Sequence, residues 1–300
     1  MNSQKILISG ASGLIGSALT NLLNQKGHSV SKLVRREAKN KNEVQWNPKS
    51  GVKNLNDLEN FDAVIHLAGE NIGGKRWTEE QKKKIRESRV QGTSVLKDEI
   101  LKLKNPPKAF ISASAIGIYG DRGNEILDEE SAVGTGFLPE LCQEWENSSK
   151  PLTQKGIRTV YVRTGVVLAP NGGALAKMLF PFKMGVGGII GNGKQFMSWV
   201  ELEDLTEIFS FAIENENVSG AINAVSPNSV TNHEFTKTLG KVLKRPTIFP
   251  LPSFVAKIVL GEMAQDLLLA SSKVTPKKLL SLGYKFGNAN LESAFRKVLN

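Results

Sequence analysis

The chain has 300 residues, 40% of them hydrophobic, and 39 Lys and Arg against 29 Asp and Glu give it a formal net charge of +10. Its only cysteine, Cys142, cannot close an intrachain disulfide, which excludes a disulfide-stapled secreted scaffold. The histidines, His28, His66 and His233, are too widely spaced to resemble a zinc site, so we expect no bound metal.

Strand and helix patterns alternate through the first two thirds of the sequence. This alternation is typical of βαβ units and predicts an α/β fold with a doubly wound, Rossmann-like parallel sheet. Beyond it, glycines and then prolines interrupt shorter elements. We place a dinucleotide-binding domain over 1–170 and a smaller C-terminal α/β substrate region over 171–300, with strands of the second returning to the first. The expected strands are 5–9, 28–34, 62–67, 108–114 and 159–168, and the expected helices 14–25, 78–103 and 137–154.

A glycine-rich turn, Gly10 to Gly16, lies between the first strand and the first helix. Glycines in this context allow a tight turn, a close approach of backbone to a pyrophosphate and close packing of helix on strand. The free N–H groups at the helix start then favour phosphate. The alternative is an ordinary strand-to-helix turn. The residues predicted to contact the cofactor here are Gly10, Ser12, Gly13, Leu14, Ile15 and Gly16.

Two arginines, Arg35 and Arg36, end the second strand, where NAD sites usually place a carboxylate. A guanidinium can stack on adenine and bind a 2′-phosphate through two hydrogen bonds. Glu37 follows at once, so an exchange of roles by one residue keeps NAD(H) as the alternative. The sequence favours NADP(H) as the cofactor.

Several segments in order along the chain carry a family resemblance: Gly10-x-x-Gly13-x-x-Gly16, 62–72, 76–77, 88–89, 112–121, 162–168 and 196–199. On these motifs the chain is similar to the extended short-chain dehydrogenase/reductases. Within them it resembles an atypical epimerase-family subgroup with a small C-terminal domain of unknown function, here near 250–298. The resemblance implies that Leu67, Ala68, Gly69 and Arg89 lie beside the cofactor and that Ser114 is the catalytic serine.

The usual proton relay of that superfamily, Tyr-x-x-x-Lys on a helix, is missing. None of the three tyrosines has a lysine four residues later. Alignment on Glu146 puts Leu138 in place of the tyrosine and Cys142 in place of the lysine. Ser114 is left to orient a reacting oxygen, and Tyr119 or water is the candidate for handling the proton. The alternative for Tyr119 is the structural role that such a tyrosine has in the superfamily's loop.

Two functions of different classes follow from these residues. The first is an NADP(H)-dependent oxidoreductase or epimerase-like enzyme acting on a small molecule. The second is a dinucleotide-binding sensor or interaction protein without turnover, related to cell division by the label that some relatives carry.

The remaining expectations concern partners and location. The basic segment 75–89 lacks interleaved aromatic residues, so we expect a solvated helix face and no specific nucleic acid. The start of the chain has no apolar region with a cleavage site, and charges interrupt the apolar stretch 254–270, which we interpret as an amphipathic or buried helix. We expect a cytoplasmic protein that binds no membrane. A homodimer is an open alternative that the resemblance implies.

Overall fold

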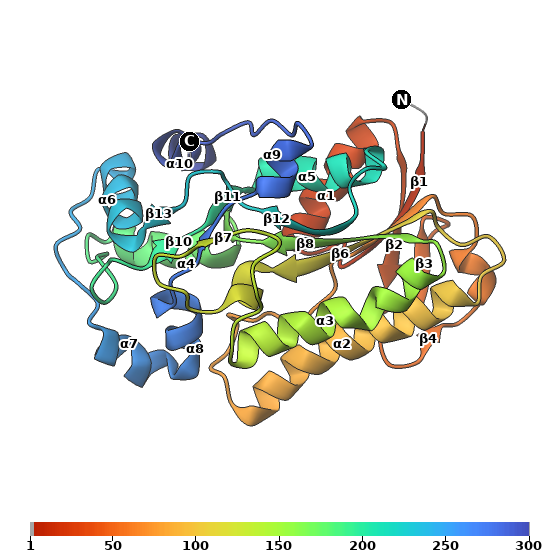
Figure 1. Cartoon of the computed structure of the whole chain (residues 1–300), viewed down its shortest axis with the longest axis horizontal. Coiled ribbons are helices and arrows are strands. Elements are labelled where there is room, and N and C mark those ends of the chain that lie inside the picture. Colours follow the sequence, from red (N-terminus) through yellow and green to blue (C-terminus); the bar gives the residue numbers. More distant parts are fainter. Residues whose placement is uncertain (1–2, 300) are drawn as a thin grey trace.

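A central eight-stranded sheet organises the computed structural model, which describes residues 3–299 (Figure 1). The strand order is β12-β8-β6-β5-β1-β2-β3-β4, and all neighbours are parallel except β3 and β4. The predicted α/β fold with a mostly parallel sheet is therefore confirmed. Its strands are β1 (Lys5–Ser9), β2 (Ser29–Val34), β3 (Glu43–Asn47), β4 (Gly51–Val52), β5 (Ala63–His66), β6 (Ala109–Ala115), β8 (Arg158–Thr164) and β12 (Gly220–Ala224).

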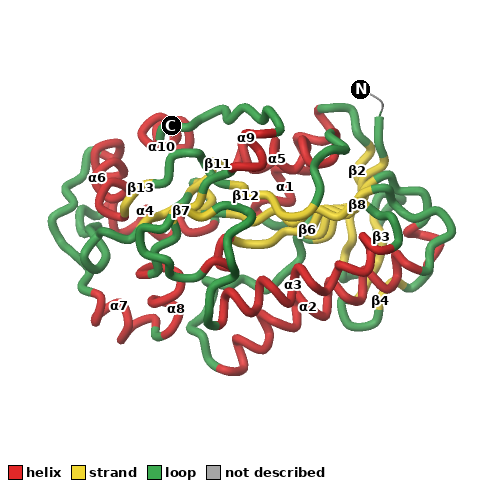
Figure 2. The backbone as a smooth tube through the Cα atoms, in the orientation of Figure 1, coloured by secondary structure: helices red, strands yellow, loops and turns green. Residues whose placement is uncertain are grey.

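Helices cover both faces of this sheet (Figure 2). Helices α1 (Leu14–Gln25) and α5 (Leu202–Glu214) pack together on one face, and α2 (Glu79–Leu101) and α3 (Phe137–Gln154) pack together on the other. Along β1, Ile6 and Ile8 join the first core while Leu7 joins the second. Because both faces of the sheet are buried, β1 and β5 are almost entirely apolar and can be recognised in the sequence, whereas β2 and β3, nearer the edge, carry polar residues between apolar ones.

The later elements gather mainly at one end of the sheet (Figure 1). They share a separate core that includes Trp199, Phe235 and Phe295, whereas α5 and β12 return to the main sheet. The remaining elements are η1 (Leu55–Leu58), η2 (Ile116–Tyr119), β7 (Ile126–Leu127), β9 (Val166–Leu168), α4 (Gly173–Lys183), β10 (Phe196–Met197), β11 (Trp199–Glu201), β13 (Val230–Thr231), α6 (Asn232–Leu243), α7 (Ser253–Leu260), α8 (Glu262–Ala264), the π-helical turn η3 (Gln265–Leu269), β14 (Lys273–Val274), α9 (Lys277–Ser281) and α10 (Leu291–Leu299).

Two expected elements are broken by glycine. The strand expected over 159–168 divides at Gly165 into β8 and β9, and β9 pairs with β11 instead of continuing in the main sheet. A Cβ at Gly165 would lie 2.6 Å from the Ser198 carbonyl oxygen, so only glycine permits this approach. The helix expected over 254–270 is interrupted at Gly261, whose φ of +63° lies in the left-handed region. Within residues 3–299 no helix is both long and apolar enough to cross a bilayer.

Candidate functional site

The glycine turn lies at the point where the strand order reverses, because β1 sits between β2 and β5 and the chain builds outward from it on both sides. Gly10 has a φ of +71°, and a Cβ there would lie 2.9 Å from Ala68 N at the end of β5. At Gly16 a Cβ would lie 2.2 Å from the Gly10 carbonyl oxygen. The glycines thus bring α1, β1 and the end of β5 together, at the crevice where such sheets bind ligands.

The start of α1 presents unused backbone donors. The Gly13 N-cap position has no side-chain cap, and the first helical hydrogen bond runs from Ser17 N to the Gly13 carbonyl oxygen at 2.9 Å. The N–H groups of Leu14, Ile15 and Gly16 therefore have no partner in the helix, and the preceding residues Ser12 and Gly13 are exposed. This cradle suits a diphosphate, since both the N–H groups and the helix dipole favour anions.

The ends of β1 and β5 are tied together by Ser9. Its Oγ accepts hydrogen bonds from Leu67 N at 3.1 Å and Ala68 N at 3.3 Å, and it lies 2.7 Å from His66 Nδ1. Complete burial lowers the pKa of His66 to about 4, so the ring is neutral at neutral pH. Leu67 and Ala68, predicted from the resemblance, are thereby held against Gly10.

The two arginines after β2 have different environments. Arg36 binds Glu43 through both carboxylate oxygens, at 2.6 and 2.8 Å, and Glu43 also accepts a hydrogen bond from Lys39 N. The hydrogen bonds from Arg36, with help from Lys39, lower the pKa of Glu43 to about 2. Arg35 is exposed, and among residues 3–299 its guanidinium has no hydrogen-bond or ion-pair partner. Arg35 is the arginine available to an incoming anion.

Arg89 packs directly beneath the loop that follows β5. Its Nη1 donates to the carbonyl oxygens of Glu70 at 3.0 Å and Ile85 at 3.3 Å, and its guanidinium carbon lies 5.2 Å from the centre of the Trp145 ring. A Cβ at Gly69 would lie 3.2 Å from that carbon. The structure therefore brings Gly69 and Arg89 together, and burial lowers the pKa of Arg89 without an acidic side chain bound to it.

Ser114 and Tyr119 belong to one buried polar network. Glu146 accepts a hydrogen bond from Ser114 Oγ at 2.7 Å and binds Arg163 through both oxygens at 2.9 Å. Arg163 also donates to Tyr119 Oη at 2.9 Å, and Tyr119 donates in turn to Asn223 Oδ1 at 2.7 Å. Burial raises the pKa of the Tyr119 phenol despite Arg163, and Tyr119 is only 1% exposed. Its hydroxyl is thus fully occupied inside the protein.

The sequence alone predicts no role for three members of this network. Arg163 lies within a motif of the resemblance, Glu146 only aligns the helix α3 with that of the family, and nothing in the sequence marks Asn223. Glu146 and Arg163 are 17 positions apart, and Tyr119 and Asn223 are 104 apart. Only the fold brings them together, because they come from α3, β8, η2 and β12.

The face of α3 that should carry the missing dyad is apolar. Leu138 lies against Gly117, whose Cβ would be 3.4 Å from the leucine Cβ. Cys142 is buried one turn further on, and burial raises the pKa of its thiol to about 12. At neutral pH this thiol is protonated and a poor nucleophile. Neither residue supplies the proton relay of a tyrosine and lysine pair.

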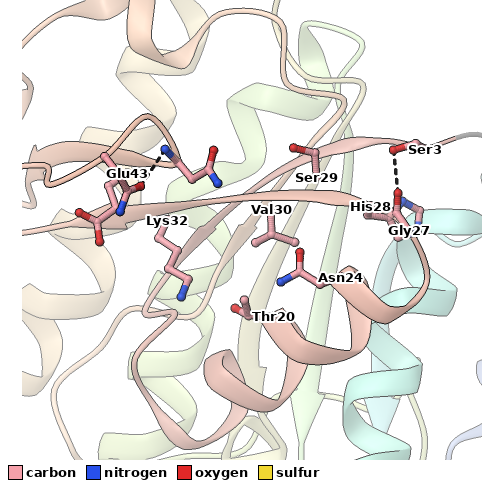
Figure 3. Close-up of a pocket in the computed structure, with 11 residues that line it drawn as sticks. Ser3, Thr20, Asn24, Gly27, His28, Ser29, Val30, Lys32 and Glu43 are labelled. Atoms are coloured by element: carbon pink, nitrogen blue, oxygen red, sulfur yellow. Dashed lines mark hydrogen bonds between the residues drawn. The ribbon is translucent and has the colours of Figure 1, made fainter.

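Two cavities in the described part of the chain bear on the site. The larger, about 530 Å³, is lined by polar side chains that include Thr20, Asn24 and Lys32 (Figure 3). Asn24 lies ten residues along α1 from Leu14, about 15 Å from the glycine turn at the helical rise, so this part of the cavity is distant from the turn; Glu43, the partner of Arg36, also lines the cavity. The smaller cavity, about 220 Å³, lies between Gly117, Leu138 and the C-terminal segment that contains Asp266.

Two other expectations concern the site. Over the described part of the chain, no three His, Cys, Asp or Glu side chains are grouped so that they could hold a metal ion. Basic residues of the 75–89 segment are engaged by acids: Lys82 by Glu79 and Glu262, and Lys84 by Glu80. These ion pairs reduce the positive potential of that segment.

Comparison with known proteins gives matches over nearly the whole chain. Residues 6–224 match the NAD dependent epimerase/dehydratase family, and residues 251–298 match a domain of unknown function, DUF1731. Epimerase family protein Mb2239 of Mycobacterium bovis is 40% identical over 98% of this chain and 97% of its own length. Epimerase family protein YfhF of Bacillus subtilis is 38% identical over 98% of this chain and 97% of its own length.

A solved structure matches as well. The crystal structure of human epimerase family protein SDR39U1 (isoform 2) with NADPH superposes with a TM-score of 0.90 at 36% identity, and the match covers 98% of each chain. The resemblance stated from the motifs is therefore confirmed.

Proposed function

Because the chain belongs to the NAD dependent epimerase/dehydratase family, we propose that it binds NADPH and transfers hydride between this cofactor and a small molecule. The observation that carries the choice of cofactor is the unengaged Arg35 guanidinium at the end of β2. The human relative SDR39U1, crystallised with NADPH, supports the same choice.

The residues that would hold the cofactor fit it chemically. The N–H groups that start α1 suit the diphosphate. Because Gly10 has no Cβ, its backbone can lie close to Ala68, and this leaves room for the cofactor at the crevice. Arg35 would bind the 2′-phosphate, and Arg36, held by Glu43, would flank the adenine ribose. When bound, the cofactor supplies the hydride chemistry, while the protein supplies position and electrostatics.

The serine and tyrosine take different roles in this proposal. Ser114, the second-last residue of β6, would orient the reacting oxygen; because its hydroxyl donates its proton to Glu146, its own oxygen is left to accept a hydrogen bond from a substrate hydroxyl. Tyr119 would act as a positioning residue, because its hydroxyl already serves Arg163 and Asn223. Ser114→Ala should therefore reduce turnover of a true substrate, and unchanged turnover would eliminate the serine as the orienting group.

Selectivity for the phosphorylated ribose tests the proposal. Arg35→Ala should weaken the binding of NADPH by about 10- to 100-fold or more, which corresponds to about 1.5–3 kcal/mol for a charge-assisted hydrogen bond. The binding of NADH should be almost unaffected. Lys39→Ala, in the same exposed loop, is the matched control and should change neither affinity by more than a few-fold. Equal losses for NADPH and NADH in Arg35→Ala would refute the 2′-phosphate contact.

One observation favours the second candidate, a dinucleotide-binding sensor without turnover: α3 presents Leu138 and Cys142 where the resemblance expects the catalytic dyad. A sensor should keep bound NADPH reduced against every aldehyde, ketone and quinone offered while a protein partner co-purifies with it. Oxidation of the bound NADPH by any such compound would favour the enzyme.

A further inference from the structure

The 220 Å³ cavity is lined by the residue that stands in place of the absent tyrosine. Leu138, which the resemblance aligns with that tyrosine, forms one wall together with Gly117 of η2. The opposite wall comes from the chain after α8 and includes Gln265, Asp266 and Ser272. The cavity therefore lies between η2, which follows β6 directly, and the C-terminal region.

The wall that carries Asp266 is held in a fixed and unusual conformation. Residues Gln265–Leu269 form a π-helical turn, closed by a hydrogen bond from Ala270 N to the Gln265 carbonyl oxygen at 2.9 Å. Two contacts anchor the following residues to the loop after η2: Ser271 N donates to Asp121 Oδ1 at 3.1 Å, and Ser272 Oγ donates to the Gly120 carbonyl oxygen at 2.8 Å. Such π-turns are frequent at functional sites.

The Asp266 carboxyl is half-buried, and no hydrogen-bond or ion-pair partner for it exists among residues 3–299. The charged groups around it are Glu262 on α8, Lys82 on α2 and Asp121 across the cavity. Lys82 is itself bound to Glu262 at 2.9 Å. Burial, followed by the charge of Glu262, raises the pKa of Asp266, and Lys82 offsets only part of this rise. A carboxyl in this state retains a proton more readily than an exposed aspartate.

We propose that Asp266 is the acid that donates a proton to the substrate oxygen in this cavity, in place of the missing tyrosine. This inference rests on the proposed function, in which the bound cofactor gives its hydride to a carbonyl carbon. The bond between the Asp266 oxygen and its proton breaks, and the carbonyl π-electron pair forms the new O–H bond of the alcohol. The carboxylate left behind regains its proton from water. In the oxidative direction the same carboxylate accepts the hydroxyl proton.

The cavity also restricts the class of substrate. Its volume is below the roughly 300–1,000 Å³ typical of pockets for drug-sized ligands. Its ten lining residues include Asp121 and Asp266 but no lysine, arginine or histidine, so a phosphate or carboxylate would find no cationic partner there. We therefore expect a small, uncharged carbonyl or hydroxyl compound rather than a sugar linked to a nucleoside diphosphate.

Kinetics of the NADPH-loaded protein test the role of Asp266. The probes are glyceraldehyde, dihydroxyacetone and diacetyl. Asp266→Asn should lower kcat by about 10²- to 10⁴-fold, the range for loss of a general acid, and leave NADPH affinity unchanged. In the wild type, kcat should fall as the pH rises through the pKa of Asp266, and Glu262→Gln should move this fall to lower pH. Asp98→Asn, on the exposed surface of α2, is the matched control.

A second measurement does not depend on turnover. In aspartate-labelled, NADP⁺-loaded protein, the ¹³C carboxyl signal that disappears in Asp266→Asn should titrate above the ordinary aspartate value of about 3.9. Titration at or below that value overturns the proposal, as does an Asp266→Asn variant with undiminished kcat. Failure of the wild type to reduce any probe, with the Asp266 signal titrating as expected, counts against the proposed function and not against the acid.

Discussion

The Glu146–Arg163 pair should contribute strongly to stability, and Arg163→Met tests this. Both side chains are only 10% exposed, and two hydrogen bonds of 2.9 Å join them. Methionine removes the charge and leaves the Glu146 carboxylate with the hydroxyl of Ser114 as its remaining side-chain donor. Breaking a buried pair from one side typically costs about 3–5 kcal/mol, and we expect that loss in the free energy of unfolding.

Urea unfolding at neutral pH measures this loss, and two further variants locate its origin. Arg122→Met breaks an ion pair with Glu125 in which the side chains are 26% and 49% exposed, and it should cost about 1 kcal/mol or less. The double variant Glu146→Leu/Arg163→Met removes both charges and should be more stable than Arg163→Met alone. A loss below about 1 kcal/mol for Arg163→Met, or a double variant no more stable than the single one, would refute the argument.

Three other changes have distinct expected outcomes. Gly16→Ala should lower Tm and weaken NADPH binding, because its Cβ would lie 2.2 Å from the Gly10 carbonyl oxygen; a Tm equal to that of the wild type would contradict the packing argument. Burial lowers the pKa of His66 from 6.5, its value in the unfolded chain, to about 4 in the folded protein. Above pH 6.5 the ring is neutral in both states, so protonation of His66 does not reduce the free energy of unfolding there. As the pH falls from 6.5 to 4, His66 should reduce the free energy of unfolding of the wild type by about 3 kcal/mol. In urea unfolding over the same pH range, His66→Asn should lose less free energy of unfolding than the wild type by this amount; equal losses would contradict the shift. Glu43→Gln should strengthen binding of NADPH but not of NADH, measured by fluorescence titration, since it removes a carboxylate beside Arg36; unchanged NADPH affinity would place this carboxylate outside the site.

The parts of the fold that local sequence determines could be predicted. The strand β1 and the helix α1 have the expected bounds because an apolar run, a glycine turn and an amphipathic helix are all local patterns. The helix α3 likewise begins at Phe137 and ends at Gln154, as expected. The break at Gly165 could not be predicted, because its cause is the distant Ser198 carbonyl oxygen.

The candidate site divides in the same way. The glycine turn can be predicted because the strand before it and the helix after it are local patterns, and they indicate why the backbone requires glycine between them. The partner of Arg36, in contrast, is Glu43 on the neighbouring strand, so the sequence alone could not distinguish the engaged arginine from the free Arg35. In the sequence, Asp266 is only one of the charges that interrupt the apolar stretch 254–270, and its place in a cavity depends on the packing of η3 against the loop after η2.

Calorimetric titration of the wild-type protein with NADPH and with NADH tests the central claim most directly. The account predicts saturable binding at a single site, tighter for NADPH, and loss of that binding in a folded Gly10→Val variant, where a side chain would block the approach of Ala68. Absence of heat with either nucleotide at millimolar concentration, or equal affinity for the two, would contradict it.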